Sequence, residues 1–183
     1  MGGWTIGWQG LPAGARPPAV TILQGVREAV GARNVLTANW GNPADVRAKA
    51  KMARVIVVAI GENAYAEGYG DNPRGALTPD QWRLVKAAEA TGRPVCSCSW
   101  PDPLMITGLV KKADAFLMAY LPGTEAGHGV ADVLFGRVSP RGKLPVSWPA
   151  SIKDVPMVKG TRLSDGKRAK SLFAYGAGLS YSK

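Results

Sequence analysis

The sequence predicts an α/β fold in which a mostly parallel sheet is covered by helices on both faces. Apolar runs typical of buried strands alternate with amphipathic segments typical of helices along most of the 183 residues. The strand candidates are continuously apolar rather than alternating, which is the pattern of strands buried on both faces. Hydrophobic residues make up 46% of the chain, enough to build a core.

The first half of the chain contains two helix candidates and two strand candidates. A helix is expected over residues 21–31, where apolar residues share one face and a glycine ends the pattern. A strand is expected over 34–40. Asn42 and Pro43 read as an N-cap and a first-turn proline that begin a helix reaching residue 53. The clearest strand, "RVIVVAIG", follows at 54–61.

A capping box marks the start of the next helix. Thr78 is the expected N-cap and Gln81 stands three residues later, so a helix is expected over 79–91. The remaining expected elements are a strand at 94–100, a short helix at 104–113, a strand at 114–121, a helix at 127–136 and a last strand at 142–149.

The chain divides into one core with two irregular ends. Residues 1–18 are rich in glycine and proline, carry two tryptophans and resemble an interdomain linker. Residues 19–150 form the predicted α/β core. Residues 151–183 lose the alternating pattern and are expected to wrap the same domain as a tail.

Charge and ligand-type residues argue against several kinds of partner. Lysine and arginine total 23 against 13 acids, but they are scattered, so a solvated basic surface is favoured over nucleic-acid binding. The apolar runs are too short for a membrane span.

Cys96 and Cys98 are expected to be buried, reduced thiols. His128 is the sole histidine and is expected in a glycine-rich turn ordered by Glu125, so neither a metal nor a cofactor is expected.

The loop directly after the clearest strand is the main candidate for function. In parallel sheets, ligands bind beyond the carboxyl ends of the strands. The loop "GENAYAEGYGDN" at 61–72 begins at such an end and holds Glu62, Glu67 and Asp71 among glycines and tyrosines. A group that reaches outward to a substrate is one interpretation, and a flexible polar surface loop is the other.

Five motifs in order resemble one known domain. "GGWTIGWQG", "GENAYAEGYGDN", "LPGTEAGHGVADVLFG", "GKLPVSWP" and "LFAYGAGLSY" have the order and spacing of the second domain of family 3 glycoside hydrolases, the β-glucosidases and exo-glucanases. The resemblance implies a three-layer sandwich with a six-stranded sheet. It also implies packing on a preceding (β/α)8 barrel, with the active site between the two domains.

The resemblance also implies roles for individual residues. The family's retaining mechanism uses a nucleophilic aspartate from the barrel and a general acid/base, which the acidic-loop match assigns to Glu67. The "GGWTIGWQG" match assigns a sugar-stacking platform to Trp8. The residues expected to support the loop or to shield Glu67 are Glu62, Tyr65, Tyr69 and Asp71.

Two features depart from the family pattern. A chain of 183 residues cannot hold a barrel as well, so the nucleophile must come from elsewhere, in cis or in trans. Where the family usually reads "SGRP", this chain has "SWPDP", which removes an arginine and adds Asp102. The geometry of that strand end is therefore expected to differ.

Three functions remain open from the sequence. The first is the acid/base half of a retaining β-glucosidase-type hydrolase, acting on a β-glucoside or β-glucan oligosaccharide. The second is a non-catalytic carbohydrate-binding or interaction module, and the third is a basic binder of polyanions. The resemblance favours a periplasmic or secreted location.

Two structural expectations accompany the first function. Glu67 is expected to be accessible and not held in an ion pair with Arg74, since a permanent partner would lower its pKa and spoil it as a proton donor. Without a barrel, the edge around Trp8, Tyr65, Tyr69 and Trp100 is expected to favour self-association.

Overall fold

The structure, a computed structural model, describes residues 18–39, 41–61, 68, 72–100, 105–156 and 168–181, with only the backbone of Trp100. Its helices and strands, in chain order, are α1 (Ile22–Val30), η2 (Ala32–Asn34), α2 (Pro43–Ala50), β1 (Ile56–Gly61), α3 (Pro79–Glu89), β2 (Val95–Trp100), α4 (Thr107–Val110), β3 (Ala115–Met118), α5 (Ala126–Leu134), β4 (Trp148–Pro149), η4 (Ile152–Asp154) and β5 (Ser171–Phe173). Each helix in this part is too short or too polar to cross a membrane.

The predicted α/β class is confirmed. Strands β1, β2 and β3 form a parallel sheet in that order, with Ile56 beside Val95 and Cys96 beside Ala115. The connections run through α3 and α4. The chain passes from β1 to β2 to β3 in one direction across the sheet. Because such crossovers are right-handed, their helices, α3 and α4, cover the same face of the sheet.

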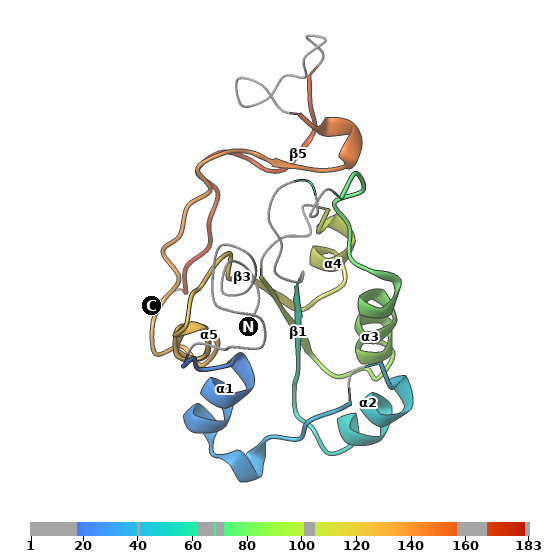
Figure 1. Cartoon of the computed structure of the whole chain (residues 1–183), viewed down its shortest axis with the longest axis vertical. Helices are drawn as coiled ribbons and strands as arrows, with labels where there is room; N and C mark the ends of the chain where they lie inside the picture. Colours follow the sequence, from blue (N-terminus) through green and yellow to red (C-terminus); the bar gives the residue numbers. More distant parts are fainter. Residues whose placement is uncertain are drawn as a thin grey trace.

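Two apolar clusters show that helices cover both faces of the sheet (Figure 1). On the α3 and α4 side, the buried residues are Ile60, Leu77, Val85 and Leu109. On the α1 and α5 side, the buried residues are Ile22, Cys98 and Val130. Alternate residues of β1 point to opposite clusters, Val57 to one and Val58 to the other, as the pleat of a strand requires.

The expected six-stranded sheet is not confirmed. The described residues contain three parallel strands and a separate two-stranded antiparallel sheet of β4 and β5. The strand predicted over 142–149 is reduced to β4, in a segment where Pro145 and Pro149 have no N–H to donate to a ladder. The tail residues pair with this segment, since Leu144 N donates to the Ala177 carbonyl and Gly176 N to the Leu144 carbonyl.

The strand predicted over 34–40 is wrong for the described residues 34–39. Residues 32–34 form η2, and the next five residues belong to neither sheet. Side chains of α2 form hydrogen bonds with the backbone of residues 35–39. Lys49 Nζ donates to the Thr37 carbonyl, and Asn39 N donates to Asp45 Oδ2. These contacts take the place of ladder bonds.

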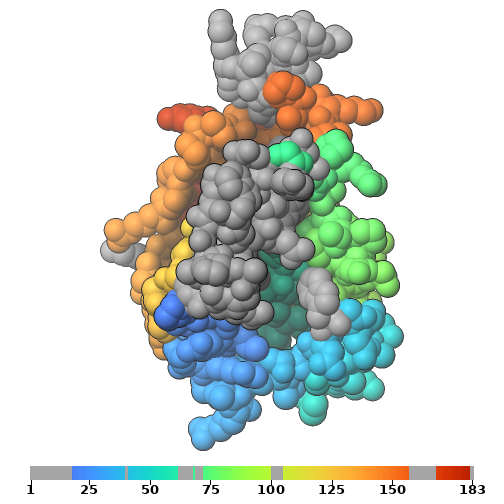
Figure 2. All heavy atoms as spheres, viewed as in Figure 1, coloured from blue at the N-terminus to red at the C-terminus, as the bar shows by residue number. Residues whose placement is uncertain are grey.

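Among the described residues, β1 therefore has a ladder partner on one side only. Its ladder partner is β2, and five of its six residues are half-buried, whereas Ile60 is fully buried. In Figure 2, atoms of this strand, in teal, are visible at the surface. They lie between α1 on one side and α2 and α3 on the other.

The packing of α1 on α5 is a contact of backbone against backbone. A Cβ added to Gly25 would lie 2.0 Å from the Gly127 carbonyl oxygen, and a Cβ added to Gly127 would lie 2.1 Å from the Thr21 carbonyl oxygen. Val20 N donates to the Thr124 carbonyl, and Gly127 N donates to the Val20 carbonyl. The two glycines therefore set how closely the helices approach.

The predicted capping box is confirmed at the start of α3. Gln81 N donates to Thr78 Oγ1 at 3.3 Å, and Thr78 N donates to Gln81 Oε1 at 2.8 Å. Thr78→Ala removes one of these bonds and is expected to lower the free energy of unfolding by about 1 kcal/mol. Urea denaturation measures this loss, and Thr78→Ser, which keeps the hydroxyl, is the control. Equal stability of the Ala and Ser variants would contradict the expectation.

Candidate functional site

The candidate site lies at the carboxyl edge of the parallel sheet. Because β1, β2 and β3 are parallel, the segments that follow Gly61, Trp100 and Met118 all leave the sheet at this edge. The residues assigned to the site from sequence lie outside the described part of the chain: Trp8, Glu62, Tyr65, Glu67, Tyr69 and Asp71. Asp102 and the side chain of Trp100 also lie outside it.

The start of the acidic loop is attached to α3. Gln81 is buried, and its Nε2 donates to the carbonyl oxygen of Gly61, the last residue of β1. The same amide group accepts from Thr78 N through Oε1. One buried side chain thus joins the end of β1 to the first turn of α3. The capping-box pattern of the sequence predicts only the helix-capping role of Gln81.

The far end of the acidic loop is attached to the segment after β2. Asn72 Oδ1 accepts from Arg74 N at 3.2 Å and from Gly75 N at 3.1 Å. Gly75 has a φ of 50°, a left-handed conformation that glycine adopts without strain. Its carbonyl accepts from Met105 N at 2.7 Å. The start of the loop is therefore bonded to α3, and the turn after its end is bonded to the segment before α4.

An aromatic pair borders the same edge. Tyr120 lies two residues after β3, and its ring centroid is 6.3 Å from that of Trp148, with the ring planes tilted by 52°. Tyr120 has a φ of 53°, which is uncommon for a residue other than glycine and is found often at functional sites. Trp148 is buried and Tyr120 is exposed. The position of Tyr120 just past a strand end is the sequence signal that could have identified it.

The first turn of α5 differs from the sequence expectation. His128 was expected in a glycine-rich turn, but it is helical, as the third residue of α5. Glu125 was expected to order the turn that holds His128. It does contact His128, since its Oε2 lies 2.7 Å from His128 Nδ1. Oε2 of Glu28, on α1, lies 2.8 Å from His128 Nε2.

The two thiols lie on the same face of β2. Cys98 is fully buried on the α1 and α5 side, and Cys96 is half-buried on the same strand face. A hydrogen bond with Cys96, together with burial, raises the pKa of the Cys98 thiol. Cys98 is therefore held as a neutral thiol.

Metal ligands do not converge in the described residues. No group of three or more histidine, cysteine, aspartate or glutamate side chains there has the arrangement to hold a metal ion. The carboxylates of Glu28 and Glu125 lie on opposite nitrogens of the His128 ring, so they do not share one point in space.

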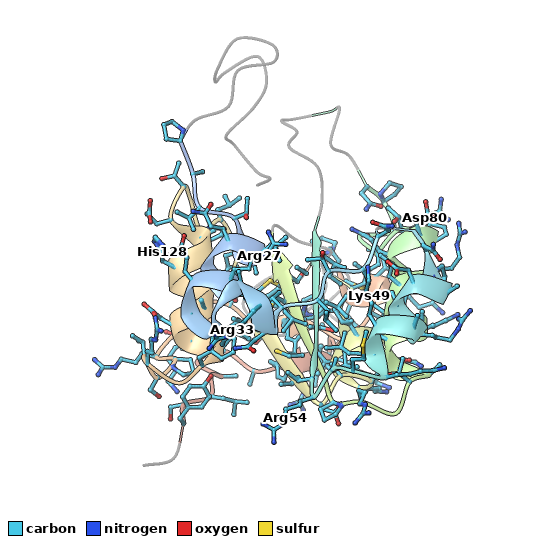
Figure 3. The ribbon with its side chains drawn as sticks, turned by 90° about the horizontal axis from the view of Figure 1, so that it is seen from below. Arg27, Arg33, Lys49, Arg54, Asp80 and His128 are labelled. Carbon is cyan, nitrogen blue, oxygen red and sulfur yellow. The ribbon has the colours of Figure 1, made fainter. Side chains whose placement is uncertain are left out.

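Basic side chains are distributed over several elements. Figure 3 labels Arg27 on α1, Arg33 on η2, Lys49 on α2 and Arg54 before β1. Lys49 lies on the other side of β1 from Arg27 and Arg33. Lys49 is used internally, in a 2.9 Å ion pair with Asp45. This distribution suits a solvated surface better than a stripe that follows a polyanion.

A family comparison matches almost the whole chain. The sequence model of the "Glycosyl hydrolase family 3 C-terminal domain" matches residues 1–181. The lysosomal beta glucosidase of Dictyostelium discoideum is 31% identical over 196 residues, covering 99% of this chain and 24% of that protein. The periplasmic beta-glucosidase of Salmonella typhimurium is 30% identical over 188 residues, covering 86% of this chain and 24% of that protein.

Solved structures agree with these relatives. The beta-glucosidase from Listeria innocua in complex with isofagomine has a TM-score of 0.73 and 25% identity, over 91% of this chain and 26% of that chain. A mutant of the same enzyme in complex with laminaribiose has a TM-score of 0.75. The chain spans about a quarter of the length of the proteins it matches.

Proposed function

Because the chain belongs to the glycosyl hydrolase family 3 C-terminal domains, we propose that it supplies the general acid/base of a retaining β-glucosidase-type hydrolase. The nucleophilic aspartate of that hydrolase comes from a (β/α)8 barrel domain, in cis or in trans. The acid/base is Glu67, in the loop after β1. The substrate is a β-glucoside or a β-glucan oligosaccharide, in keeping with the names of the relatives.

The chemistry assigns two tasks to one carboxyl group. In the first step, Glu67 donates its proton to the glycosidic oxygen as the bond to the anomeric carbon breaks and the barrel aspartate forms a glycosyl ester. In the second step, the Glu67 carboxylate takes a proton from water as that water attacks the anomeric carbon and releases the aspartate. The configuration at the anomeric carbon is retained.

The attachment of the acidic loop is the observation that carries the proposal. Gln81 holds the Gly61 carbonyl at the loop's start, and Gly75 holds Met105 at its end. A catalytic carboxyl must be positioned to within a fraction of an ångström, and a loop fixed at both ends by the scaffold restricts where its middle can lie. The loop also leaves the sheet at the edge where parallel sheets bind ligands.

Aromatic side chains complete the proposed sugar site. Trp8 is assigned the platform on which the apolar face of the pyranose stacks, and Tyr65 and Tyr69 exclude water around Glu67. An apolar and partly closed surrounding raises the pKa of a carboxyl and keeps it protonated for its first task. The exposed ring of Tyr120 lies just past β3, at the same edge of the sheet.

The isolated chain is expected to fold and not to hydrolyse aryl β-glucosides above the uncatalysed rate. A general acid without the opposing nucleophile cannot form the glycosyl ester, so the double displacement has no first step. Release of the phenol is measured by absorbance with purified chain. Robust hydrolysis that Glu67→Gln abolishes would contradict this account, because it would require a nucleophile within the 183 residues.

Binding measurements distinguish the proposed hydrolase domain from a non-catalytic carbohydrate-binding module. A carbohydrate-binding module would bind glucosides tightly as the isolated chain, with an affinity that Glu67→Gln leaves unchanged. The proposed half-site buries only one side of the sugar, so the isolated chain is expected to bind weakly. Calorimetric titration with laminaribiose distinguishes the two.

A further inference from the structure

The ring of His128 is bonded on both sides by carboxylates from two elements. Its Nδ1 lies 2.7 Å from Glu125 Oε2, at the start of α5, and its Nε2 lies 2.8 Å from Glu28 Oε2, on α1. Figure 3 shows His128 on α5, beside the α1 ribbon. The ring is half exposed, so solvent protons reach it.

This geometry requires the charged form of the ring. A carboxylate oxygen can only accept a hydrogen bond, and a neutral imidazole has a single N–H to donate. With a carboxylate at each nitrogen, the neutral ring would turn a lone pair toward one of the two anions. Only the imidazolium donates to Glu28 and Glu125 together.

We propose that His128 is a protonation-dependent clamp that joins α1 to α5 when charged and releases one of its two carboxylates when neutral. The clamp is placed where it can act on the contact between the helices. Gly25 and Gly127 form the backbone contact between the helices. His128 directly follows Gly127, and Glu28 lies three residues after Gly25. Without the bond to Glu28, the helix contact keeps its backbone bonds, its apolar packing and the bond from Arg137 Nη2 to the Ala29 carbonyl.

Other charged groups at this contact are few in the described part of the chain. On α1 they are Arg27 and Glu28. On α5 and its N-cap they are Asp132 and Glu125, and Asp132 pairs with Arg137 at 3.5 Å. The segment 18–21 that also packs here carries none. The two carboxylates bonded to the ring therefore dominate its titration.

The direction of the pH dependence follows from the two partners. Hydrogen bonds with Glu28 and then Glu125 raise the pKa of His128 above its ordinary value of 6.5. The stability that the clamp contributes is then fully present below about pH 6.5 and is lost as the pH rises through the folded pKa. On the acid side, hydrogen bonds with Gln24 and His128 lower the pKa of Glu28, so its contribution is lost only as the pH falls through that lowered value. The clamp is closed between these limits.

The consequence concerns the segment that precedes α1. Residues 1–18 are expected to link the domain to a barrel, and α1 is the first helix after them. A clamp on α1 would make that attachment firmer in acid than in alkaline solution. This consequence rests on the proposed function, whereas the clamp itself does not.

A titration of the folded chain by NMR tests the clamp directly. His128 is the sole histidine, so its ring signals need no assignment. The expected result is a His128 pKa above 6.5 that falls toward 6.5 in both Glu28→Gln and Glu125→Gln. Asp132→Asn is the matched control, since it removes a charge from the same helix without touching the ring, and it is expected to leave that pKa nearly unchanged. A wild-type pKa at or below 6.5 would overturn the proposal.

Hydrogen exchange of the α1 amides tests whether the ring acts on the helix. After correction for the intrinsic pH dependence of exchange, opening of α1 is expected to increase as the pH rises through the His128 pKa. The increase is about tenfold for each unit by which the folded pKa exceeds the unfolded one. In His128→Asn the corrected exchange is expected to be independent of pH over this range. The same increase in His128→Asn, or a raised pKa with no effect on α1, would show that the ring does not clamp the helix.

Discussion

Gly127→Ala is expected to lower the free energy of unfolding by at least about 2 kcal/mol. The new Cβ would lie 2.1 Å from the Thr21 carbonyl oxygen and 2.7 Å from Val20 Cγ1, whereas distances under 3.0 Å are essentially never seen. The atom it meets first is backbone, which cannot turn aside as a side chain can. Relief requires α1 to move away from α5, and this opens the cluster around Ile22, Cys98 and Val130.

Gly129→Ala is the matched control for this prediction. Gly129 lies on the same helix, and a Cβ there would meet nothing within 4 Å. Alanine is the better helix former, so this variant is expected to gain up to about 1 kcal/mol. The two substitutions are chemically identical and opposite in expected sign. Urea denaturation that gave both variants the same stability would mean that α1 and α5 do not pack through their backbones.

Glu67→Gln is expected to cost 10²–10⁴-fold, by order of magnitude, in the hydrolysis of a disaccharide by the chain joined to a family 3 barrel. A disaccharide has a poor leaving group, so its departure depends on the proton that the carboxyl donates. For a dinitrophenyl glucoside, the leaving group needs no proton, and the first step is expected to keep most of its rate. Steady-state and burst kinetics with the two substrates measure this contrast.

Glu62→Gln is the control within the same loop. It makes the same chemical change, but Glu62 is assigned a supporting role, so its loss is expected to be smaller and similar for both leaving groups. If Glu62→Gln showed the dependence on the leaving group and Glu67→Gln did not, the acid/base would be Glu62.

Much of the fold could be predicted because its signals are local. The capping box of Thr78 and Gln81 needs four residues of sequence, and the strands β1 and β3 are each marked by an apolar run. The strand predicted over 34–40 was wrong because its competitors are not local to it. Lys49 and Asp45 belong to the next helix, α2, and bond backbone groups of this segment that lie 12 and 6 residues before them.

The candidate site was less predictable for the same physical reason. Gln81 and Gly61 are 20 residues apart, and Glu28 and His128 are 100 residues apart. No local pattern connects such pairs, because their contact depends on how the helices cover the sheet. Gly25 and Gly127 indicate a close helix contact only when they are considered together. Each glycine alone only indicates a less stable helix.

The role of Glu67 is tested most directly by the product that azide gives with Glu67→Gln in the chain joined to a family 3 barrel. With an activated glucoside, the variant is expected to accumulate the glycosyl ester, because no base activates water for the second step. Azide needs no base, so it should speed turnover and yield the β-glucosyl azide, with retained configuration. Wild-type protein, whose Glu67 carboxylate repels the anion, should not respond. The absence of an azide effect in Glu67→Gln, or a product with inverted configuration, would contradict the assignment of Glu67 as the acid/base of a retaining enzyme.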